Sequence, residues 1–368
     1  MAIWRLSVIF LSLFTVWSSA KPQCGTHVDC KTCVNSKSWI GKSCRWCPLD
    51  RNCHADGSPL NPCLQNQNVK DAAKCQERKY GRYDTKAAFW YTLMSAAAYT
   101  NDPQKCLRKI YPTGDFVIKN IIRHSCEDLP LFKYEECFAY TAVSNKKRII
   151  VVAFRGTVIN SLQIYDQIIS ILTTPKTSFP TGGNVQRYFA NAYQKLYQGV
   201  NASVTSLVRQ YPAYDVVVTG HSLGGAIASL AAVSLVYQKL VPVNRMYLYT
   251  YGLPRVGDKQ YALNHDRLLN NSWRVVHNRD IVSHLPTCNI FTGCFFPSNG
   301  PYHHRTEVFY PDQTMNQGSQ YIQCKGDDDE KCSDGMITRK PCIIDLSKCI
   351  KYHEYYFGIR VGTLCDGS

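Results

Sequence analysis

Cysteine is the residue that most constrains how this chain can fold. The 368 residues include 18 cysteines, and eight of these lie between Cys24 and Cys75. That segment contains Gly, Pro, Asn and Asp throughout and has almost no hydrophobic periodicity, so disulfides rather than an apolar core must hold it together. The spacing alone does not choose among the many pairings that eight cysteines allow. A zinc site at Cys44-x-x-Cys47 is the alternative, but so many cysteines indicate an oxidising compartment, which disfavours it.

The first twenty residues predict that compartment. Arg5 precedes the apolar run from Leu6 to Trp17, and Ser18-Ser19-Ala20 supplies a small-residue cleavage site. This pattern is typical of a secretory signal peptide over residues 1–20, with the mature chain beginning near Lys21. No later stretch approaches the ~20 apolar residues of a membrane-spanning helix. We therefore expect a secreted protein, extracellular or luminal, with no transmembrane segment.

The charge of the chain is strongly positive but scattered. Lys and Arg number 42 against 27 Asp and Glu, which gives a formal net charge of +15. The longest basic cluster is Lys146-Lys147-Arg148, and no aromatic residues are interleaved around it. We therefore expect no nucleic-acid partner and a solvated basic surface. Its alternative role is a weak preference for anionic lipid surfaces or acidic glycans.

The chain after the cysteine-rich segment alternates strand-like and helix-like runs. Residues 147–154 and 215–219 are β-branched runs typical of strands buried on both faces, and residues 245–251 and 273–277 are further strand candidates. Residues 224–240 are rich in Ala, Leu and Val and predict a buried helix. This alternation indicates an α/β domain with a mostly parallel sheet. We place a cysteine-rich module at 21–78 and the α/β domain at 79–368.

The G-x-S-x-G sequence around Ser222 is the strongest chemical signal. Gly220-His221-Ser222-Leu223-Gly224 follows a predicted strand directly and opens the small-residue helix, as a nucleophile elbow requires. The elbow would expose the Ser222 hydroxyl and direct the N–H of Leu223 at a developing oxyanion. His221 points away from the nucleophile by its position in the turn, so we expect it to pack rather than to act as a base.

A serine nucleophile needs an imidazole base, which in turn needs a carboxylate. In α/β-hydrolase chains the order is serine, acid, histidine, and Asp280 follows the strand at 273–277. A surface-turn aspartate is the alternative for Asp280. Among the later histidines, His284 is expected to pack under the acid. The base is either in the pair His303-His304 or is His353, and spacing does not decide between them.

Four separated motifs resemble the class 3 lipases, a family of secreted fungal triacylglycerol lipases and related feruloyl esterases. The motifs are Phe154-Arg155-Gly156-Thr157, the sequence from Gly220 to Gly225, Asp280-Ile281-Val282-Ser283-His284-Leu285-Pro286, and His353-Glu354-Tyr355-Tyr356-Phe357-Gly358. The resemblance implies an α/β-hydrolase fold and a Ser222–Asp280–His353 triad, with Thr157 joining Leu223 as an oxyanion donor. It implies no metal or cofactor and a lipid ester substrate at a lipid–water interface. Feruloyl esterase or phospholipase activity, or a lipase-fold binding protein, are the alternatives.

The resemblance also bears on the remaining cysteines. Cys106 and Cys365 match a family bridge that ties the last segment to the first long helix. Local bridges are expected for Cys126–Cys137 and Cys324–Cys332, and proximity suggests Cys288–Cys294 and Cys342–Cys349. The N-terminal cysteine order, with Cys30-x-x-Cys33 and Cys44-Arg-Trp-Cys47-Pro, resembles a plexin–semaphorin–integrin module, which implies a protein or glycan partner.

Three further features are expectations from local sequence. Residues Val158 to Leu172 space apolar side chains on one helical face, which favours a lid over the site, with a core helix as the alternative. The Asn-Trp pair that the fungal lipases usually carry there is replaced by Leu162-Gln163, so the substrate preference of such a lid stays open. Asn201 and Asn270 begin glycosylation sequons. The acidic run Asp327–Glu330 is expected to be a solvated loop rather than a calcium site.

Overall fold

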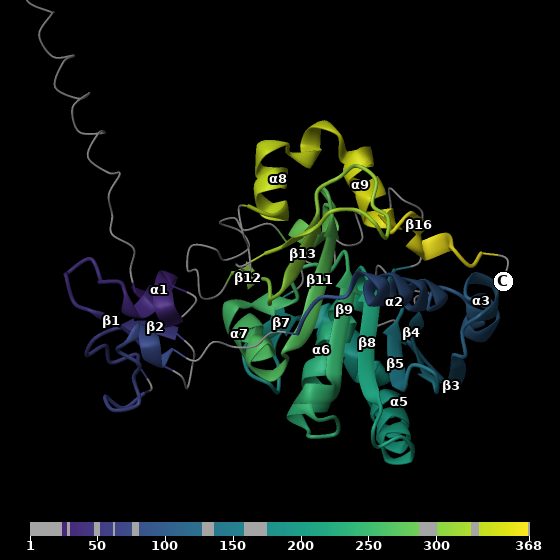
Figure 1. The fold of residues 1–368 in the computed structure, drawn as a ribbon, viewed down its shortest axis with the longest axis horizontal. Helices are drawn as coiled ribbons and strands as arrows, with labels where there is room; N and C mark the ends of the chain where they lie inside the picture. Colours follow the sequence, from purple (N-terminus) through teal and green to yellow (C-terminus); the bar gives the residue numbers. More distant parts are fainter. Residues whose placement is uncertain are drawn as a thin grey trace, which may run out of the picture. The chain divides into compact units, whose positions relative to one another are not determined.

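The computed structural model describes residues 24–27, 30–47, 52–61, 63–75, 81–126, 136–157, 175–286, 300–324 and 331–366. The chain divides into two compact units, Met1–Arg78 and Lys79–Ser368. The predicted signal peptide, the predicted lid, the Cys288–Cys294 pair and the acidic run at 327–330 all lie outside the described residues. Figure 1 shows the helices and strands of both units.

The first unit is a small disulfide framework. It contains α1 (Cys30–Val34) and an antiparallel hairpin of β1 (Cys44–Cys47) and β2 (Asn52–Ala55). Four disulfides interlock these elements: Cys24–Cys44, Cys30–Cys75, Cys33–Cys53 and Cys47–Cys63. The buried cluster of this unit consists of cysteines with Trp46 and Ala55 packed against them. Cross-links therefore replace the apolar core that so short a segment cannot build.

The second unit is built on an eight-stranded sheet in the order β14-β13-β11-β9-β8-β5-β4-β3. The pairs from β5 through β8, β9 and β11 to β13 are parallel, and the antiparallel strands β3, β4 and β14 lie at the two edges. The α/β-hydrolase fold predicted from the sequence is confirmed. The strands are β3 (Val117–Ser125), β4 (Glu136–Ser144), β5 (Ile149–Phe154), β8 (Asp215–His221), β9 (Met246–Tyr251), β11 (Asn271–His277), β13 (Glu307–Tyr310) and β14 (Ile322–Gln323).

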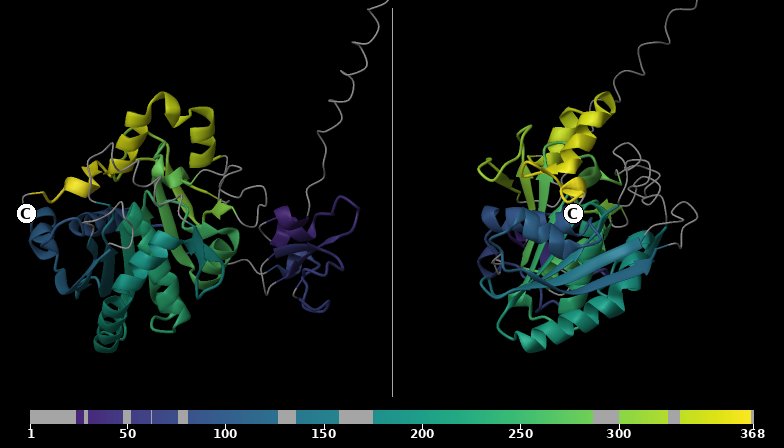
Figure 2. Two further views of the ribbon diagram at one scale, coloured as in Figure 1. Left: turned by 180° about the vertical axis from the view of Figure 1, so that it is seen from behind. Right: turned by 90° about the vertical axis from the view of Figure 1, so that its right-hand side faces the viewer.

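The central strands are buried on both faces because helices cover both. Along β5, Ile150, Val152 and Phe154 join one core cluster, whereas Val151 and Ala153 join the other. The period of two in a strand accounts for this division. The first cluster includes α5 (Arg187–Gln210) and α6 (Leu223–Tyr237), and the second includes α2 (Thr85–Ala97) and part of α3 (Pro103–Ile110). Figure 2 shows these helices around the sheet from two further sides.

The remaining elements lie mostly after β9. A second sheet of four short strands has the order β12-β10-β7-β6. Its strands are β6 (Lys176–Ser178), β7 (Asn184–Gln186), β10 (Gly257–Asp258) and β12 (Pro301–Tyr302), and α7 (Lys259–Leu268) follows β10. The C-terminal segment contains α8 (Ser333–Arg339), α9 (Leu346–Glu354), β15 (Tyr355–Tyr356) and β16 (Ile359–Arg360).

Four disulfides join described cysteines of this unit. The structure pairs Cys106 with Cys365, which links α3 to the end of the chain across 259 positions. The other three pairs are local: Cys126–Cys137, Cys324–Cys332 and Cys342–Cys349. Because the C-terminal segment from α9 onward is anchored in this way, His353 at the end of α9 is held against the carboxyl ends of the strands.

Candidate active site

Ser222 occupies a sharp turn between β8 and α6. Its backbone has φ 58° and ψ −131°, a strained combination for a residue with a side chain. The N–H of Ser222 donates to the carbonyl of Tyr251 at 2.8 Å, which fixes the turn to β9. Ser222 is 3% exposed. The predicted strand–turn–helix context of the G-x-S-x-G motif is therefore present.

The glycines around Ser222 are required by close backbone contacts. A Cβ on Gly220 would lie 2.3 Å from the carbonyl oxygen of Gly224, and a Cβ on Gly224 would lie 2.3 Å from that of Phe154. Backbone atoms cannot move aside as a side chain can. Gly220 is required because β8 lies against the start of α6, and Gly224 is required because α6 begins against the end of β5.

Asp280 lies in the turn that follows β11 and is completely buried. Its Oδ1 accepts the N–H of Val282 at 2.9 Å, and its Oδ2 accepts the hydroxyl of Tyr356 at 2.5 Å. Burial by itself raises the pKa of this carboxyl, but His353 and the hydrogen bonds from His353 and Tyr356 outweigh it and lower the pKa to about 2. Asp280 is therefore a buried carboxylate that stays ionised over the ordinary pH range, and it is not a surface-turn residue.

His353 contacts Asp280 directly. Its Nδ1 lies 3.0 Å from each of the two carboxylate oxygens, and the ring is 1% exposed. Because an ionised carboxylate can only accept, Nδ1 carries the proton and Nε2 keeps its lone pair when the ring is neutral. Gly252 makes room for this pair: a Cβ there would lie 2.7 Å from both Asp280 Oδ2 and His353 Nδ1.

The imidazole ring of His221 packs against the face of the His353 ring. The two rings stack with centroids 4.6 Å apart, and His221 Nε2 is 2.8 Å from the backbone carbonyl of His353. That carbonyl can only accept, so Nε2 is the donor, and Nδ1 accepts the Tyr99 hydroxyl at 2.8 Å. Burial, together with repulsion from His353, lowers the pKa of His221 to about 3. His221 is thus a neutral ring that positions the backbone of His353, a more specific role than the packing expected from sequence.

The other histidines after Asp280 face elsewhere. His284 bonds through Nδ1 to the carbonyl of Asp280 at 2.7 Å, as its predicted place under the acid requires. His303 Nε2 bonds to the carbonyl of Ser283 at 2.7 Å, and His304 stacks on His265 with centroids 3.5 Å apart. Only His353 among them is bonded to the carboxylate of Asp280 in the described part of the chain.

Three polar atoms at this site are buried and lack a hydrogen-bond partner among the described residues. They are Ser222 Oγ, His353 Nε2 and Thr157 Oγ1. Thr157 follows β5, and the preceding Gly156 is packed so closely that a Cβ there would lie 2.6 Å from the His221 carbonyl oxygen. Leu223 begins α6, so its N–H has no acceptor within the helix. Buried polar groups are normally satisfied, so this cluster is suited to binding a polar reacting group.

Two residues of the site have roles that sequence reasoning missed. Tyr356 is part of the C-terminal motif, but nothing in the sequence shows that its hydroxyl reaches Asp280. Tyr99 lies outside all four motifs and bonds His221 from the end of α2. Their contacts span sequence separations of 76 and 122 residues, so no local pattern could have revealed them.

Groups that resemble metal sites do not have metal-site geometry. Cys24, Cys44 and Cys53 are disulfide-bonded, as are Cys324 and Cys332 beside Glu307. In the third group, formed by His265, Asp266 and His304, the imidazoles are stacked with an interplanar angle of 16°. With the ring centroids 3.5 Å apart and the rings nearly parallel, the in-plane lone pairs of the two imidazoles do not converge on one ion. Asp266 Oδ1 also accepts the N–H of Arg305 at 2.8 Å.

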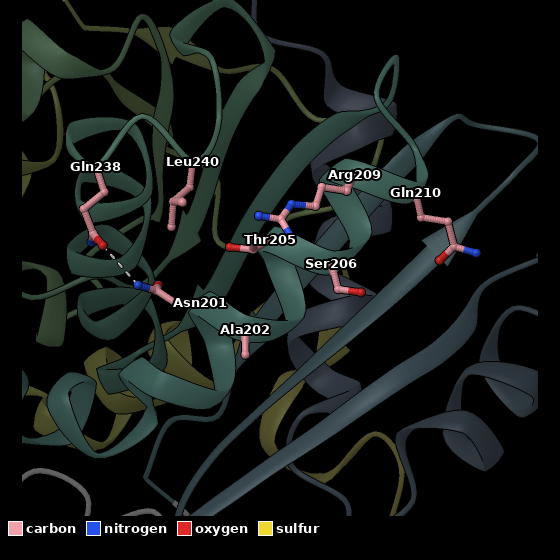
Figure 3. A pocket seen from close by; sticks show the side chains of 8 residues that line it. All are labelled: Asn201, Ala202, Thr205, Ser206, Arg209, Gln210, Gln238 and Leu240. Carbon is pink, nitrogen blue, oxygen red and sulfur yellow. Dashed lines mark hydrogen bonds between the residues drawn. The ribbon is translucent and has the colours of Figure 1, made fainter.

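A separate open groove of about 740 Å³ lies between α5 and the far end of α6 (Figure 3). Its lining is polar apart from an alanine and a leucine, and Asn201 there donates to Gln238 at 3.1 Å. Gln238 follows the last residue of α6, whereas Ser222 precedes the first. A 15-residue helix is about 22 Å long, so this groove is not part of the site around Ser222.

Among the described residues, no helix has the length and apolar character needed to cross a membrane.

The elbow serine beside a buried Asp–His pair, on a mostly parallel sheet, defines a serine hydrolase of the α/β-hydrolase fold. The sequence profile of the family described as Lipase (class 3) matches residues 151–290. A lipase of Caenorhabditis elegans is 32% identical over 304 residues, covering 78% of this chain and 83% of that protein. A lipase of Rhizomucor miehei is 31% identical over 287 residues, covering 75% of this chain and 69% of that protein. The chain belongs to the class 3 lipase family and is a carboxylic ester hydrolase.

Solved structures agree with the fold. The Rhizomucor miehei lipase in complex with its propeptide superposes with a TM-score of 0.59 at 27% identity, covering 76% of this chain and 82% of that one. A triacylglycerol lipase structure, described as having a serine protease triad as its catalytic centre, superposes with a TM-score of 0.59 at 28% identity and covers 76% of this chain and 96% of that one.

Proposed function

We propose that Ser222, Asp280 and His353 form the catalytic triad of a secreted lipase that cleaves carboxylic esters of lipids. The observation that carries this proposal is the pairing of His353 Nδ1 with both oxygens of buried Asp280, in a site where Ser222 Oγ and His353 Nε2 are among the buried groups that lack a partner in the described residues. Asp280 holds the imidazole in the tautomer whose Nε2 can accept a proton.

The reaction then follows from these positions. Ser222 Oγ attacks the ester carbonyl carbon while His353 Nε2 takes the hydroxyl proton. The N–H of Leu223 and Thr157 hold the oxyanion, since that N–H has no acceptor within α6 and Thr157 Oγ1 has no partner among the described residues. Collapse of the tetrahedral intermediate releases the alcohol, which takes the proton from His353. Water then repeats the sequence on the acyl-enzyme and frees the carboxylic acid.

Ser222→Ala tests the triad. The variant should lose several orders of magnitude in kcat, because the attack step then has no protein nucleophile. Ser234→Ala, in the same helix but three turns away, is the matched control and should keep its activity. Far-UV circular dichroism checks that both variants are folded. If Ser222→Ala kept more than about a tenth of the activity, Ser222 would not be the nucleophile.

Triacylglycerol is the proposed first-choice substrate, since relatives are lipases and one solved neighbour is a triacylglycerol lipase. Feruloyl esters and phospholipids are the alternatives on this fold. A panel of triglyceride, phospholipid and feruloyl ester separates them.

We further propose that Val158–Leu172 acts as a lid, because it begins one residue after Thr157. Hydrolysis of a short-chain triglyceride should then jump above its solubility limit, and simple saturation through that limit would contradict the lid.

Secretion is proposed from the signal peptide at 1–20 and is supported by the disulfides in both units.

Asn270 is the better placed of the two sequons for a glycan. Asn201 lies in the middle of α5 with its amide nitrogen bonded to Gln238, and Ser203 of the same sequon is buried and bonded to Thr141. Glycopeptide mass spectrometry of the secreted chain tests both sites.

The N-terminal unit is proposed as a plexin–semaphorin–integrin-like module, supported by its interlocked disulfides.

A further inference from the structure

The N-terminal unit presents a tight turn between α1 and β1. The N–H of Ser38 donates to the carbonyl of Lys42 at 2.8 Å, and the N–H of Gly41 donates to the carbonyl of Ser38 at 2.9 Å. Lys37 and Ser43 form an antiparallel bridge at its base. Gly41 has φ +80°, which a residue with a side chain rarely adopts. We call residues Lys37–Ser43 the tip.

Disulfides hold the tip rigidly on both sides. Cys33, in α1 before the tip, is bonded to Cys53, and Cys44, directly after it, is bonded to Cys24. The carbonyl of Ser36 accepts the N–H of Cys44 at 2.9 Å, which closes the base of the tip. The tip therefore keeps its shape without any contribution from its own side chains to a core. In Figure 1 it is the segment of the small unit that leaves α1 and returns to β1.

The two residues at the end of the tip are large, apolar and exposed. Trp39 is 70% exposed and Ile40 is 56% exposed. Trp46, four positions after the tip's Lys42, instead packs on the cysteine cluster. A largely exposed Trp-Ile pair on a rigid turn adds little to the core of the unit and lowers solubility, so it indicates a surface that is covered in use.

The charges around this pair are positive. Lys37 and Lys42 flank it on both sides and are exposed. Asp56, whose N–H bonds to Ser43 at the base of the tip, is paired with Arg45 at 2.8 Å. Between Cys24 and Cys75 there are seven Lys and Arg residues against four Asp and no Glu. The end of the tip thus combines an aromatic and an aliphatic side chain with two exposed lysines that have no ion pair among the described residues.

We propose that the tip is a membrane anchor that inserts Trp39 and Ile40 into an anionic lipid–water interface. Trp is favoured at such interfaces because its ring is apolar and its indole N–H remains hydrated. Lysines beside it are attracted to anionic headgroups, and their long apolar stems allow the charged ends to stay at the surface. The anchor adds a binding surface to the proposed ester hydrolysis and stands without it. It would hold the hydrolase unit of the same chain near its lipid substrate.

Vesicle binding tests the proposal with the full mature chain. Vesicles of ether-linked phosphatidylcholine, with and without ether-linked phosphatidylglycerol, contain no carboxylic ester, so binding is measured apart from hydrolysis. Trp39→Ala with Ile40→Ser should lower partition onto the anionic vesicles at least tenfold, about 1.4 kcal/mol. Lys37→Gln with Lys42→Gln should lower it by ~10- to 30-fold. The control is Leu60→Ser, at an apolar residue 82% exposed in the same unit but outside the tip, and its binding should be unchanged.

A soluble short-chain ester separates this proposal from the catalytic one. All these variants should hydrolyse it at the wild-type rate, because the tip belongs to the other unit. If wild-type protein hydrolyses the ester but does not bind the anionic vesicles, the anchor is wrong and the hydrolase function stands. Equal binding by the Trp39/Ile40 variant would also overturn the anchor, and a protein partner would then be the occupant to seek.

Discussion

Tyr356→Phe removes one hydrogen bond from the buried carboxylate and leaves the ring in place. The Tyr356 hydroxyl donates to Asp280 Oδ2 at 2.5 Å, and both residues are 0% exposed. Water cannot easily replace a donor in such a site. Hydrogen bonds to charged groups contribute ~1.5–3 kcal/mol, so the free energy of unfolding at neutral pH should fall by about that amount.

The same substitution should lower kcat more than it changes KM. Asp280 keeps its bonds from His353 and Val282, but it loses one of the contacts that fix its orientation and hence that of His353. If most of the lost hydrogen-bond energy reaches the transition state, kcat falls by ~10- to 100-fold, since each tenfold corresponds to about 1.4 kcal/mol. The assay is steady-state hydrolysis of a soluble ester.

The loss of stability should depend on pH in a defined direction. Asp280 has a folded-state pKa of about 2, below the ~3.9 of an unfolded aspartate, so its contribution is present above pH ~4 and is lost as the pH falls toward 2. Removing the Tyr356 donor raises the folded-state pKa of Asp280. The pH range between the folded-state and unfolded-state pKa of Asp280 then becomes narrower. The stability difference between wild type and variant should therefore be full at pH 7 and shrink toward pH 2 in urea unfolding.

Tyr140→Phe is the matched control. Tyr140 is also completely buried, and its hydroxyl donates to a neutral acceptor, the carbonyl of Met94, at 2.8 Å. This variant should lose ~0.5–1.5 kcal/mol of stability with unchanged kcat and no pH dependence of the loss. If Tyr356→Phe behaved like Tyr140→Phe in kcat and in pH dependence, Tyr356 would be a structural residue with no part in orienting the triad.

Two further perturbations test how the triad is held. Gly252→Ala would place a Cβ 2.7 Å from Asp280 Oδ2 and from His353 Nδ1, at a φ of +61°. Small misplacements of reacting groups can slow a reaction strongly, so kcat should fall by at least ~100-fold. A folded variant with wild-type kcat would show that the Asp280–His353 pair tolerates displacement. Replacing Cys106 and Cys365 together by Ser removes the bridge to the C-terminal segment and should lower the free energy of unfolding by ~2–5 kcal/mol in urea titrations, whereas equal stability of variant and wild type would mean that the bridge does not stabilise the fold.

The sequence predicted the central strands because burial on both faces leaves a simple pattern. The β-branched runs at 147–154 and 215–219 became β5 and β8, shifted by two residues at most, and the Ala-rich run at 224–240 became α6, three residues shorter at its end. The pattern did not identify β4 and α5. Strand β4 (ECFAYTAVS) mixes small, aromatic and hydroxyl side chains, and α5 carries several Tyr and Gln residues on a half-exposed helix. Burial on both faces removes the alternation from β4, whereas the buried residues of α5 do recur at helical spacing among polar and aromatic neighbours, a signal that the strand-based pattern did not use.

The proposed nucleophile, Ser222, was predictable because the geometry of its turn is local. Gly220, Ser222 and Gly224 lie within five residues, and the strand before them and the helix after them are each legible in the sequence. The contacts that position Asp280 and His353 come from residues that are distant in the sequence. Gly252, after β9, and Tyr356, in β15, meet Asp280 only because the sheet brings the ends of β9 and β11 together and the C-terminal segment crosses them.

The choice among the later histidines shows what the sequence lacks. A general base must have one nitrogen oriented by a partner and the other nitrogen available to the substrate. His303 has its Nε2 bonded to Ser283, and burial, with the charges of Arg274 and Arg255, lowers its pKa well below the usual value. His304 is stacked on another imidazole, and burial together with that ring lowers its pKa in the same way. His303 also has one nitrogen, Nδ1, without a partner among the described residues, so the feature that sets His353 apart is the Asp280 carboxylate that orients its Nδ1. Hydrogen-bond partners, which spacing does not encode, are therefore what distinguish the proposed base, His353, from His303 and His304, which are equally buried.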